Sequence, residues 1–287
     1  MQISNAERAE VLVRALPLIQ QYNGKTIVIK YGGNAMVTPA LQNAVMEDIC
    51  LMRQVGMRVV LVHGGGPDIS GTLKRLGKET VFKNGLRVTD QETVDVAQMV
   101  LAGKVGKNLV NLINSKGGRA IGICGLDGRL IEARPKDPEL GLGFVGDIVA
   151  IHAQPVIDLL NCGYIPVVSG LGYDDDCHVY NINADTVAAE LAGKLGAECL
   201  ISVTDESGVL MDKDDPSTLI SHLSMRTAKR LIEEGVIAGG MIPKTECCLE
   251  ALRAGVKKVF IIDGRVPHSI LMELLTDEGL GTMFTKN

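Results

Sequence analysis

Two hydrophobic spacings alternate along this chain. Short apolar runs such as residues 26–30 and 58–62 suit buried strands, whereas residues 39–55 carry apolar side chains every three or four positions, as amphipathic helices do. This alternation predicts an α/β fold with a mainly parallel sheet and helices on both faces. Because ligands of such folds bind at the carboxyl ends of the strands, residues that follow strands are the first candidates for a site.

The predicted elements cover most of the chain. Strands are expected at residues 26–30, 58–62, 120–124, 130–133, 144–150, 165–169, 178–182, 199–203, 258–262 and 281–285. Helices are expected at residues 4–22, 39–55, from 67 onward, and at 89–115, 155–161, 184–195, 224–234, 244–254 and 266–275. We expect the short strands between residues 119 and 150 to form hairpins, and the last strand to lie at an edge of the sheet.

The first predicted helix precedes the first strand. Ser4 and Glu7 have the spacing of a capping box, and Asn23-Gly24 ends the helix. Its apolar face consists of Leu12, Leu16 and Ile19. Such a face requires a partner, which is either the chain's own domain or another subunit.

Two glycine-rich turns follow the first two strands. Lys30 stands directly before the first turn, which contains Gly32 and Gly33, and residues 64–66 form a second turn of three glycines. Glycine lets backbone N–H groups approach an anion with no Cβ in the way. Lys30 adds a positive charge at the same edge, so the pair of turns predicts phosphate chemistry, although a lysine here could also snorkel to solvent.

Four further polar residues stand near strand or helix ends. The planar fork of Arg87 suits a carboxylate, although alone it would be read as a surface arginine. Asp185 follows the predicted N-cap Asn183, which suits the helix dipole, whereas Asn181 is better explained by contact with a ligand. Lys244 follows two glycines at a predicted helix start, where a cation opposes the dipole, and this favours a phosphate partner over an exposed lysine.

Several other patterns favour no chemistry. Residues 141–146 fit G-x-G-x-x-G, but they follow a proline-broken loop and run into a predicted strand, so they fail as a dinucleotide site. The three aspartates at 174–176 are read as a solvated turn, and His63 as a packing or hydrogen-bonding residue. Seven cysteines without a C-x-x-C pair predict buried thiols instead of disulfides or a zinc site.

Composition narrows the function classes. The net charge is −5 and no dense basic block occurs, which disfavours a nucleic-acid partner. Apolar runs are short and the first residues lack a signal-peptide core, so we expect neither a membrane span nor secretion, and the cytosol is the expected location.

Five motifs in order resemble the amino-acid-kinase family over nearly the whole chain from about residue 24. They are Val-Ile-Lys-Tyr-Gly-Gly, Val-His-Gly-Gly-Gly-Pro, Lys-Asn-Gly-Leu-Arg-Val-Thr, Tyr-Asn-Ile-Asn-Ala-Asp-Thr and Gly-Gly-Met-Ile-Pro-Lys. The resemblance implies a three-layer αβα sandwich with a mainly parallel central sheet in one domain. It divides the chain into an N-terminal helix (1–23), a lobe for an acylated amino acid (24–172) and a nucleotide lobe (173–287).

The same resemblance implies an activity and roles for single residues. It implies that ATP phosphorylates the side-chain carboxylate of N-acetyl-L-glutamate in arginine biosynthesis. Mg²⁺ is expected to be held by the nucleotide phosphates and water, and no protein ligand is assigned to it. Lys30 and Lys244 would stabilise the transferred phosphoryl group, and Asp185 would orient both lysines. Substrate contacts would come from Gly65, Gly66, Arg87 and Asn181. Phosphate and nucleotide contacts would come from Gly32, Gly33, Gly64, Thr204, Asp205, Gly208, Leu210 and Met241.

The N-terminal helix resembles the extension of arginine-inhibited members of the family, which interlace such helices into hexamers. The resemblance implies a homo-oligomer, with arginine as inhibitor and a PII-type signalling protein as a further partner. Implied contacts for arginine are Tyr22, Lys194, His268 and Glu273, although a surface lysine and a helix-end histidine explain two of them equally well.

Other functions stay open from the sequence. One alternative is a sister kinase that acts on another carboxylate, such as N-acetylaminoadipate or an acetylated aspartate. Alternatives from other classes are a dinucleotide-dependent oxidoreductase and a non-catalytic regulatory binding protein. Turnover of ATP with a defined acceptor separates all of these.

Overall fold

An eight-stranded sheet forms the centre of the molecule in the computed structural model, which describes residues 4–33, 38–83, 85–276 and 279–287. In spatial order the strands are β12 (His222–Ser224), β14 (Thr282–Thr285), β13 (Lys258–Asp263), β11 (Cys199–Thr204), β1 (Thr26–Tyr31), β2 (Arg58–His63), β8 (Ile165–Ser169) and β5 (Ala120–Cys124). All neighbours pair in parallel except β13 and β14. The mainly parallel sheet predicted from the sequence is confirmed.

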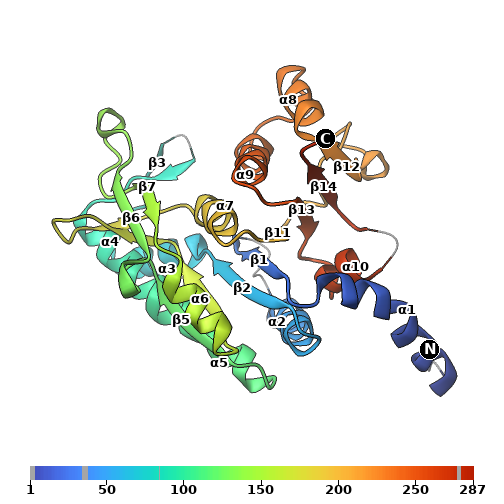
Figure 1. Cartoon of the computed structure of the whole chain (residues 1–287). Helices are drawn as coiled ribbons and strands as arrows, with labels where there is room; N and C mark the ends of the chain where they lie inside the picture. The colour runs from blue at the N-terminus through green and yellow to red at the C-terminus, as the bar shows by residue number, and fades with distance from the viewer. Residues whose placement is uncertain (1–3, 34–37, 84, 277–278) are drawn as a thin grey trace.

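Helices cover both faces of this sheet and complete three layers. One face is covered by α2 (Pro39–Gln54), α3 (Gly66–Arg75), α4 (Gln91–Gln98), a π-helix (Met99–Val105), α5 (Gly106–Ser115) and α10 (Ser269–Leu275). The other face is covered by α6 (Gln154–Asn161), α7 (Ala184–Lys194), α8 (Met225–Glu233) and α9 (Met241–Arg253). In Figure 1, α7 and α9 lie above β1 and β2, and α2 lies below them.

Side-chain alternation along β1 decides where its lysine goes. Ile27, Ile29 and Tyr31 belong to the core cluster on the α2 face, and Val28 belongs to the cluster on the α7 face. Successive strand residues point to opposite faces, so Lys30 shares the face of Val28. The apolar residues of β1 are thus buried on both faces of the sheet, and the side chain of Lys30 points toward α7.

A second, four-stranded sheet lies beside the main one. It contains β10 (Val179–Asn181), β9 (Leu171–Tyr173), β6 (Ile131–Pro135) and β7 (Gly146–Ile151), and β3 (Phe82–Lys83) pairs with β4 (Leu86–Arg87) separately. Two predictions are corrected here. β5 pairs in parallel with β8 instead of forming a hairpin, and β14 lies between β12 and β13 instead of at an edge.

Helix boundaries differ from the sequence pattern at two places that matter for the site. The helix expected at 89–115 begins after Asp90, whose carboxylate caps it, and widens into the π-helix halfway along. The helix expected at 244–254 already begins at Met241. Short 3-10 turns occupy Asp127–Arg129, Pro138–Leu140 and Pro216–Thr218.

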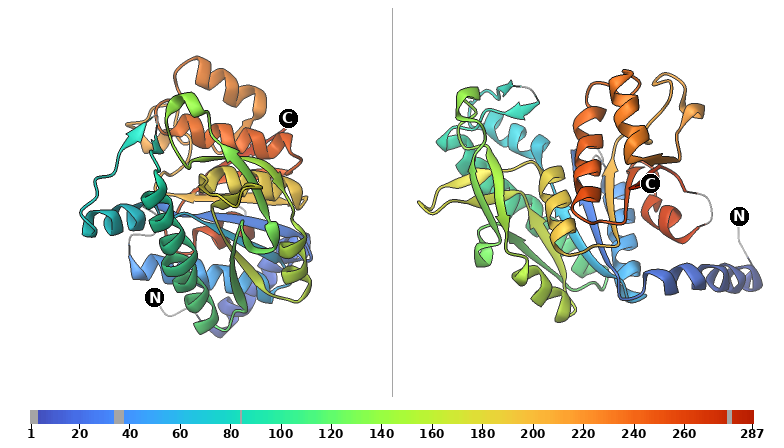
Figure 2. Two further views of the ribbon diagram at one scale, coloured as in Figure 1. Left: turned by 90° about the vertical axis from the view of Figure 1, so that its left-hand side faces the viewer. Right: turned by 45° about the horizontal axis from the view of Figure 1, so that its top comes forward.

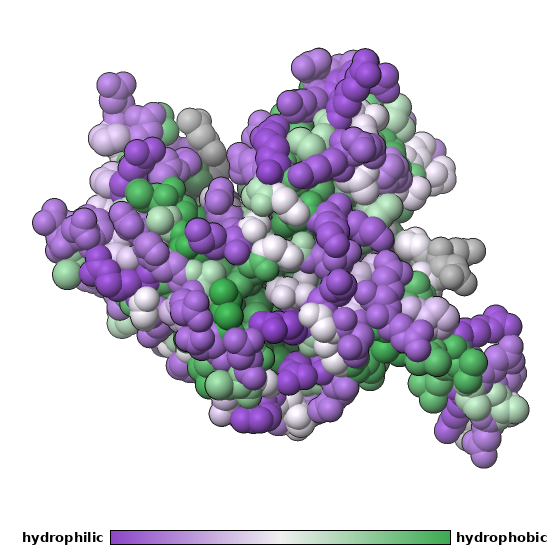
Figure 3. All heavy atoms as spheres, in the orientation of Figure 1, coloured by the Kyte–Doolittle hydropathy of each residue, from purple (hydrophilic) through white to green (hydrophobic). Residues whose placement is uncertain are grey.

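The N-terminal helix α1 (Asn5–Tyr22) begins with the predicted capping box, because Ser4 and Glu7 bond to each other's backbone N–H groups. Figure 2 shows this helix extending away from the body of the molecule. Its apolar residues are exposed in this single chain, namely Val11, Leu12, Val13 and Leu16. Figure 3 shows apolar surface on the projecting helix. Among the described residues no helix is long and apolar enough to cross a bilayer.

Candidate active site

The carboxyl ends of the three central strands β11, β1 and β2 bring the predicted residues together. Lys30 is only 8% exposed, and its Nζ lies 2.9 Å from Oδ1 of Asp185 in the first turn of α7. Asn183 caps this helix by accepting the N–H of Asp185, which fixes the turn that carries the carboxylate. A nearly buried lysine with a carboxylate partner keeps its ammonium in one place, as a phosphate-binding group requires.

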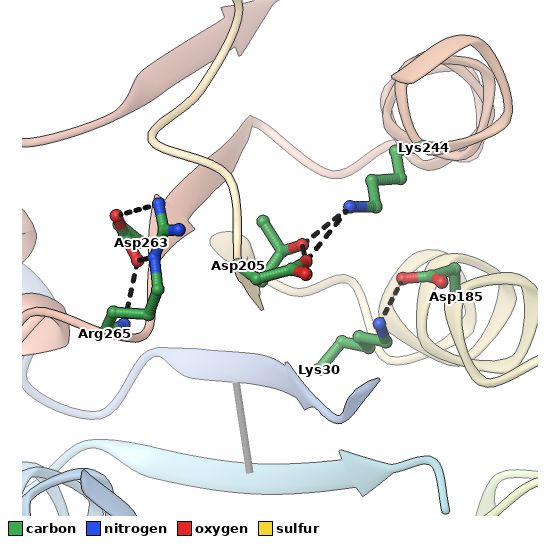
Figure 4. Close-up of polar contacts among 7 residues, drawn as sticks. Lys30, Asp185, Asp205, Lys244, Asp263 and Arg265 are labelled. Carbon is green, nitrogen blue, oxygen red and sulfur yellow. Dashed lines mark hydrogen bonds and ion pairs between the residues drawn. The ribbon is translucent and has the colours of Figure 1, made fainter. Parts of the chain in front are cut away.

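Lys244 extends toward the same region from α9, which packs over the sheet. It lies in the first turns of α9, and its Nζ donates to Thr204 Oγ1 at 2.7 Å and lies 3.7 Å from Asp205 Oδ1. In Figure 4 the side chains of Lys30 and Lys244 extend into the space between β1 and α9. In this structure the carboxylate beside Lys244 is Asp205, directly after β11. The predicted role of Asp185 in orienting both lysines stays a prediction.

The two glycine turns touch each other. A Cβ on Gly32 would lie 3.0 Å from the backbone N of Gly64, and Gly64 in turn lies close to Ala184 at the start of α7. A Cβ on Gly65 would lie 2.8 Å from Leu101 of the π-helix. Close packing therefore favours glycine at positions 32 and 65. The turns meet the amino-terminal ends of α3 and α7, where backbone N–H groups favour anions.

A cavity of about 780 Å³ opens beside Lys244. Its lining includes three of the residues predicted to contact the nucleotide, namely Gly208, Leu210 and Met241, together with Lys244. Thr204 and Asp205 contact Lys244 instead of lining this cavity. The volume falls within the range of small-molecule sites.

Arg87 lies at the end of β4, inside the N-terminal half. Its Nη2 donates to Gly66 O and to Ser70 Oγ, both at 2.9 Å, and its Nη1 donates to Thr80 Oγ1 at 3.3 Å. Its guanidinium also lies over the ring of Phe82. Burial lowers the pKa of Arg87. The arginine is thus tied to the second glycine turn, while residue 84 of its motif lies outside the described residues.

Comparisons with known proteins decide the family. Residues 25–263 match the amino acid kinase family. The chain belongs to this family. It is 54% identical to an acetylglutamate kinase of Clostridium beijerinckii over 282 residues, which are 98% of this chain and 99% of that protein. An amino acid kinase transfers a phosphoryl group, so the protein is a phosphotransferase.

Solved structures agree with this assignment. N-acetylglutamate synthase from Neisseria gonorrhoeae, complexed with coenzyme A and N-acetyl-glutamate, matches with a TM-score of 0.85 at 27% identity. The match covers 97% of this chain and 63% of the synthase chain, so this kinase spans less than two thirds of that protein. The same synthase complexed with coenzyme A and L-arginine matches with a TM-score of 0.82 at 26% identity, covering 97% of this chain and 65% of that one.

The structure shows an ion pair at the carboxyl end of β13 that the sequence analysis did not single out. Arg265 donates from Nε and Nη2 to the two carboxylate oxygens of Asp263, at 2.9 and 2.8 Å (Figure 4), and Ser207 Oγ lies 3.5 Å from Asp263 Oδ2. Burial alone would raise the pKa of Asp263, but the Arg265 bonds outweigh it and the pKa is lowered. The available signal was Asp263 itself, an acid at the carboxyl end of an apolar strand.

Asn181 ends β10, where its backbone N–H donates to Phe144 O at 2.8 Å. Its backbone is therefore fixed by the second sheet, two residues before the cap of α7. Its predicted role as a substrate contact stays a prediction.

The four residues predicted for arginine come from three parts of the fold, namely α1, the end of α7, and α10 with its N-cap. Tyr22 is buried at the end of α1, and Lys194 is exposed at the end of α7. His268 Nδ1 lies 2.6 Å from Asp48 Oδ1 of α2, and Glu273 on α10 accepts two backbone N–H groups of the segment before β14. Because α10 contacts both α1 and α2, three of the four lie around one junction.

The predicted solvated turn at 174–176 carries the one metal-like group found among the described residues. Ligand atoms of Asp174, Asp176 and His178 lie within 4.8 Å of one another. Asp176 and His178 are exposed, and His178 Nδ1 bonds to Asp174 Oδ2 at 2.9 Å. The contacts suit a solvated turn with an internal Asp–His pair.

Proposed function

We propose that this kinase uses ATP to phosphorylate the side-chain carboxylate of N-acetyl-L-glutamate, in arginine biosynthesis. The observation that carries the proposal is the meeting of Lys30, Asp185 and the two glycine turns at one sheet edge, in a chain that is 54% identical to an acetylglutamate kinase over nearly its whole length. The half that carries Arg87 holds the acyl amino acid, and the half that carries the cavity beside Lys244 holds ATP.

The chemistry requires charge compensation more than proton transfer. The acceptor carboxylate is ionised at pH 7, because its reference pKa is about 4.3. It attacks without a general base, and the barrier is the repulsion between two anions. One ammonium about 4 Å from such a charge contributes on the order of 4 kcal/mol at an effective dielectric constant of about 20. Lys30 and Lys244 supply this compensation from opposite sides.

Backbone amides and Arg87 supply the positioning. N–H groups of the turns at Gly32–Gly33 and residues 64–66 face the transferred group, and Asn181 and Arg87 hold the acylated amino acid. The bonds to Gly66 O, Ser70 and Thr80 account for three of the five N–H groups of Arg87, which leaves donors for a carboxylate. Holding both reactants in line supplies a further part of the rate.

The cavity beside Lys244 fits a magnesium-bound nucleotide. Its volume of about 780 Å³ suits a small ligand, and the start of α9 at Met241 faces it with helical N–H groups. Mg²⁺ bound with the nucleotide would neutralise part of the phosphate charge. The nucleotide in this cavity would contact Lys244, Gly208 and Leu210, which line it.

A turnover assay tests the function. The purified chain is incubated with Mg-ATP, and formation of ADP is measured with N-acetyl-L-glutamate, N-acetylaminoadipate, N-acetylaspartate and free glutamate in parallel. We expect N-acetyl-L-glutamate to give the highest kcat/KM. A higher kcat/KM with N-acetylaminoadipate would identify the sister kinase, and no ADP with any acceptor would refute the kinase activity proposed here.

Replacing Arg87 tests the acceptor site. Arg87→Lys keeps the charge but loses the planar fork, and we expect the KM for N-acetyl-L-glutamate to rise about 10- to 100-fold, since bonds to a charged group contribute ~1.5–3 kcal/mol. The KM for ATP is expected to stay within about twofold. Arg75→Lys, at the exposed end of α3, is the matched control. An unchanged acceptor KM in Arg87→Lys would remove this arginine from the site.

We also propose inhibition by arginine and assembly through α1. The proposal draws on the exposed apolar residues of α1 and on the related synthase, whose structure contains L-arginine. Leu12 is 70% exposed, so Leu12→Glu should convert a hexamer into smaller species in sedimentation velocity without loss of basal activity. A monodisperse small species in the wild type would refute the assembly.

Wild-type turnover should fall with added arginine. Docking of a PII-type signalling protein stays a prediction.

A further inference from the structure

His63 ends β2 and stands directly before the second glycine turn. Its side chain is 1% exposed. Residues 59 and 61 of the same strand belong to the core cluster on the α2 face, and alternation places His63 on that face too. Its ring therefore lies on the side of the sheet opposite Lys30, away from the reacting groups.

The contacts of the ring determine its tautomer. Nδ1 lies 2.9 Å from the carbonyl oxygen of Gly64, and a carbonyl can only accept, so Nδ1 carries the hydrogen. Nε2 is buried and finds no hydrogen-bond partner among the described residues. A Cβ on Gly106 would lie 3.2 Å from Nε2, so the glycine makes room for the ring. Burial lowers the pKa of His63, which keeps the ring neutral at pH 7.

Holding the Gly64 carbonyl also orients the next amide. The carbonyl of Gly64 and the N–H of Gly65 belong to one peptide unit, which is planar and trans, so the two groups point in opposite directions. Since His63 holds the carbonyl toward the α2 face, the N–H of Gly65 points toward the α7 face. That is the face on which Lys30 meets Asp185.

The surroundings leave this peptide unit little freedom. Glycine peptides rotate easily, because no Cβ restricts them. Here Leu101 and Val105 of the π-helix pack against Gly65, and Gly32 approaches Gly64 from the other turn. Packing confines the turn from both sides, and the bond from Nδ1 selects one orientation of the peptide within that space.

We propose that His63 is a positioning residue of the phosphotransfer site, whose neutral ring holds the Gly64 carbonyl and thereby aims the Gly65 N–H at the transferred phosphoryl group. This inference rests on the proposed function. His63 touches neither reactant, so its contribution is the preorganisation of one donor. Losing one such donor typically lowers kcat about 10²- to 10³-fold.

Three substitutions separate this role from simple packing. The amide nitrogen of Asn occupies nearly the position of Nδ1, whereas that of Gln reaches the position of Nε2. We expect His63→Leu and His63→Gln to lower kcat about 100-fold, with both KM values within about threefold. His63→Asn should retain kcat within about tenfold of wild type, although it leaves the larger void. Equal kcat in His63→Leu and wild type, or a larger loss in His63→Asn than in His63→Gln, would overturn the proposal.

Two further readouts complete the test. Because the ring stays neutral, the kcat–pH profiles of wild type and His63→Asn should have the same shape between pH 7 and 9. Crystal structures of wild type and His63→Leu without ligands should show the Gly64–Gly65 peptide reoriented in the variant, and an unchanged peptide would refute the inference. This structural arm decides the role of His63 even if wild type fails to phosphorylate N-acetyl-L-glutamate, which would refute only the proposed function.

Discussion

Lys30→Ala is expected to lower kcat by about three orders of magnitude while the chain remains folded. The substitution removes the nearly buried ammonium that meets Asp185 at 2.9 Å, and it leaves that carboxylate facing the incoming anions. Both changes raise the barrier for joining two negative groups. Initial-rate kinetics with N-acetyl-L-glutamate and ATP measure the effect, and circular dichroism with thermal melting checks the fold.

Lys257→Ala is the matched control for this experiment. Lys257 meets Glu198 at 2.8 Å, almost the same distance, but its side chain is 65% exposed and lies at the opposite ends of the strands. Its loss should leave kcat unchanged. The double variant Lys30→Ala/Asp185→Ala should lose less than the product of the two single effects, because the residues act as a unit. A kcat within tenfold of wild type in Lys30→Ala would contradict the assigned role.

Gly32→Ala is the second substitution with a large expected effect, about a 100-fold loss of kcat. The new Cβ would lie 3.0 Å from the N and 3.3 Å from the Cα of Gly64. Both are backbone atoms, so one turn must move relative to the other. That movement displaces the amides of two turns from the phosphoryl path at once. The same kinetic assay measures the loss, and the melting temperature reports how much of the effect is structural.

Gly71→Ala provides the control for adding a methyl group at a glycine. Gly71 lies within α3, and a Cβ there meets no atom within 4 Å. Alanine in a helix interior is favoured over glycine by about 0.5–1 kcal/mol, so this variant should melt slightly higher and keep its kcat. Full activity in Gly32→Ala would show that the two turns tolerate separation.

The sequence predicts the centre of the site well because its signals are local. Lys30 and the residues at 64–66 end apolar runs, and parallel strands place their carboxyl ends at one edge. The contact between Lys244 and Asp205 has no local signal, because the two residues are distant in sequence and only the packing of α9 near the end of β11 brings them within 3.7 Å.

Elements that depend on distant pairing were the hardest to predict. A short apolar sequence is equally compatible with a central strand and with an edge strand. The position of β14 between β12 and β13 therefore has no local signal in the sequence. The three-residue strand β9 is too short for a periodic pattern. The π-helix Met99–Val105 reads as ordinary helix, and its register shift accompanies packing against Gly65, which no sequence spacing encodes.

Pairing each ammonium with its own carboxylate has a consequence for how fast ligands arrive. The formal charges of each pair, Lys30 with Asp185 and Lys244 with Asp205, cancel. The net charge of the whole chain is −5. Long-range attraction of an anion needs an uncompensated field, and these two pairs contribute little to one, so Arg87 is the site cation that adds to it. Capture of both anionic reactants is therefore a short-range event in which each lysine exchanges an internal partner for a new one. Association rates should consequently respond only weakly to ionic strength.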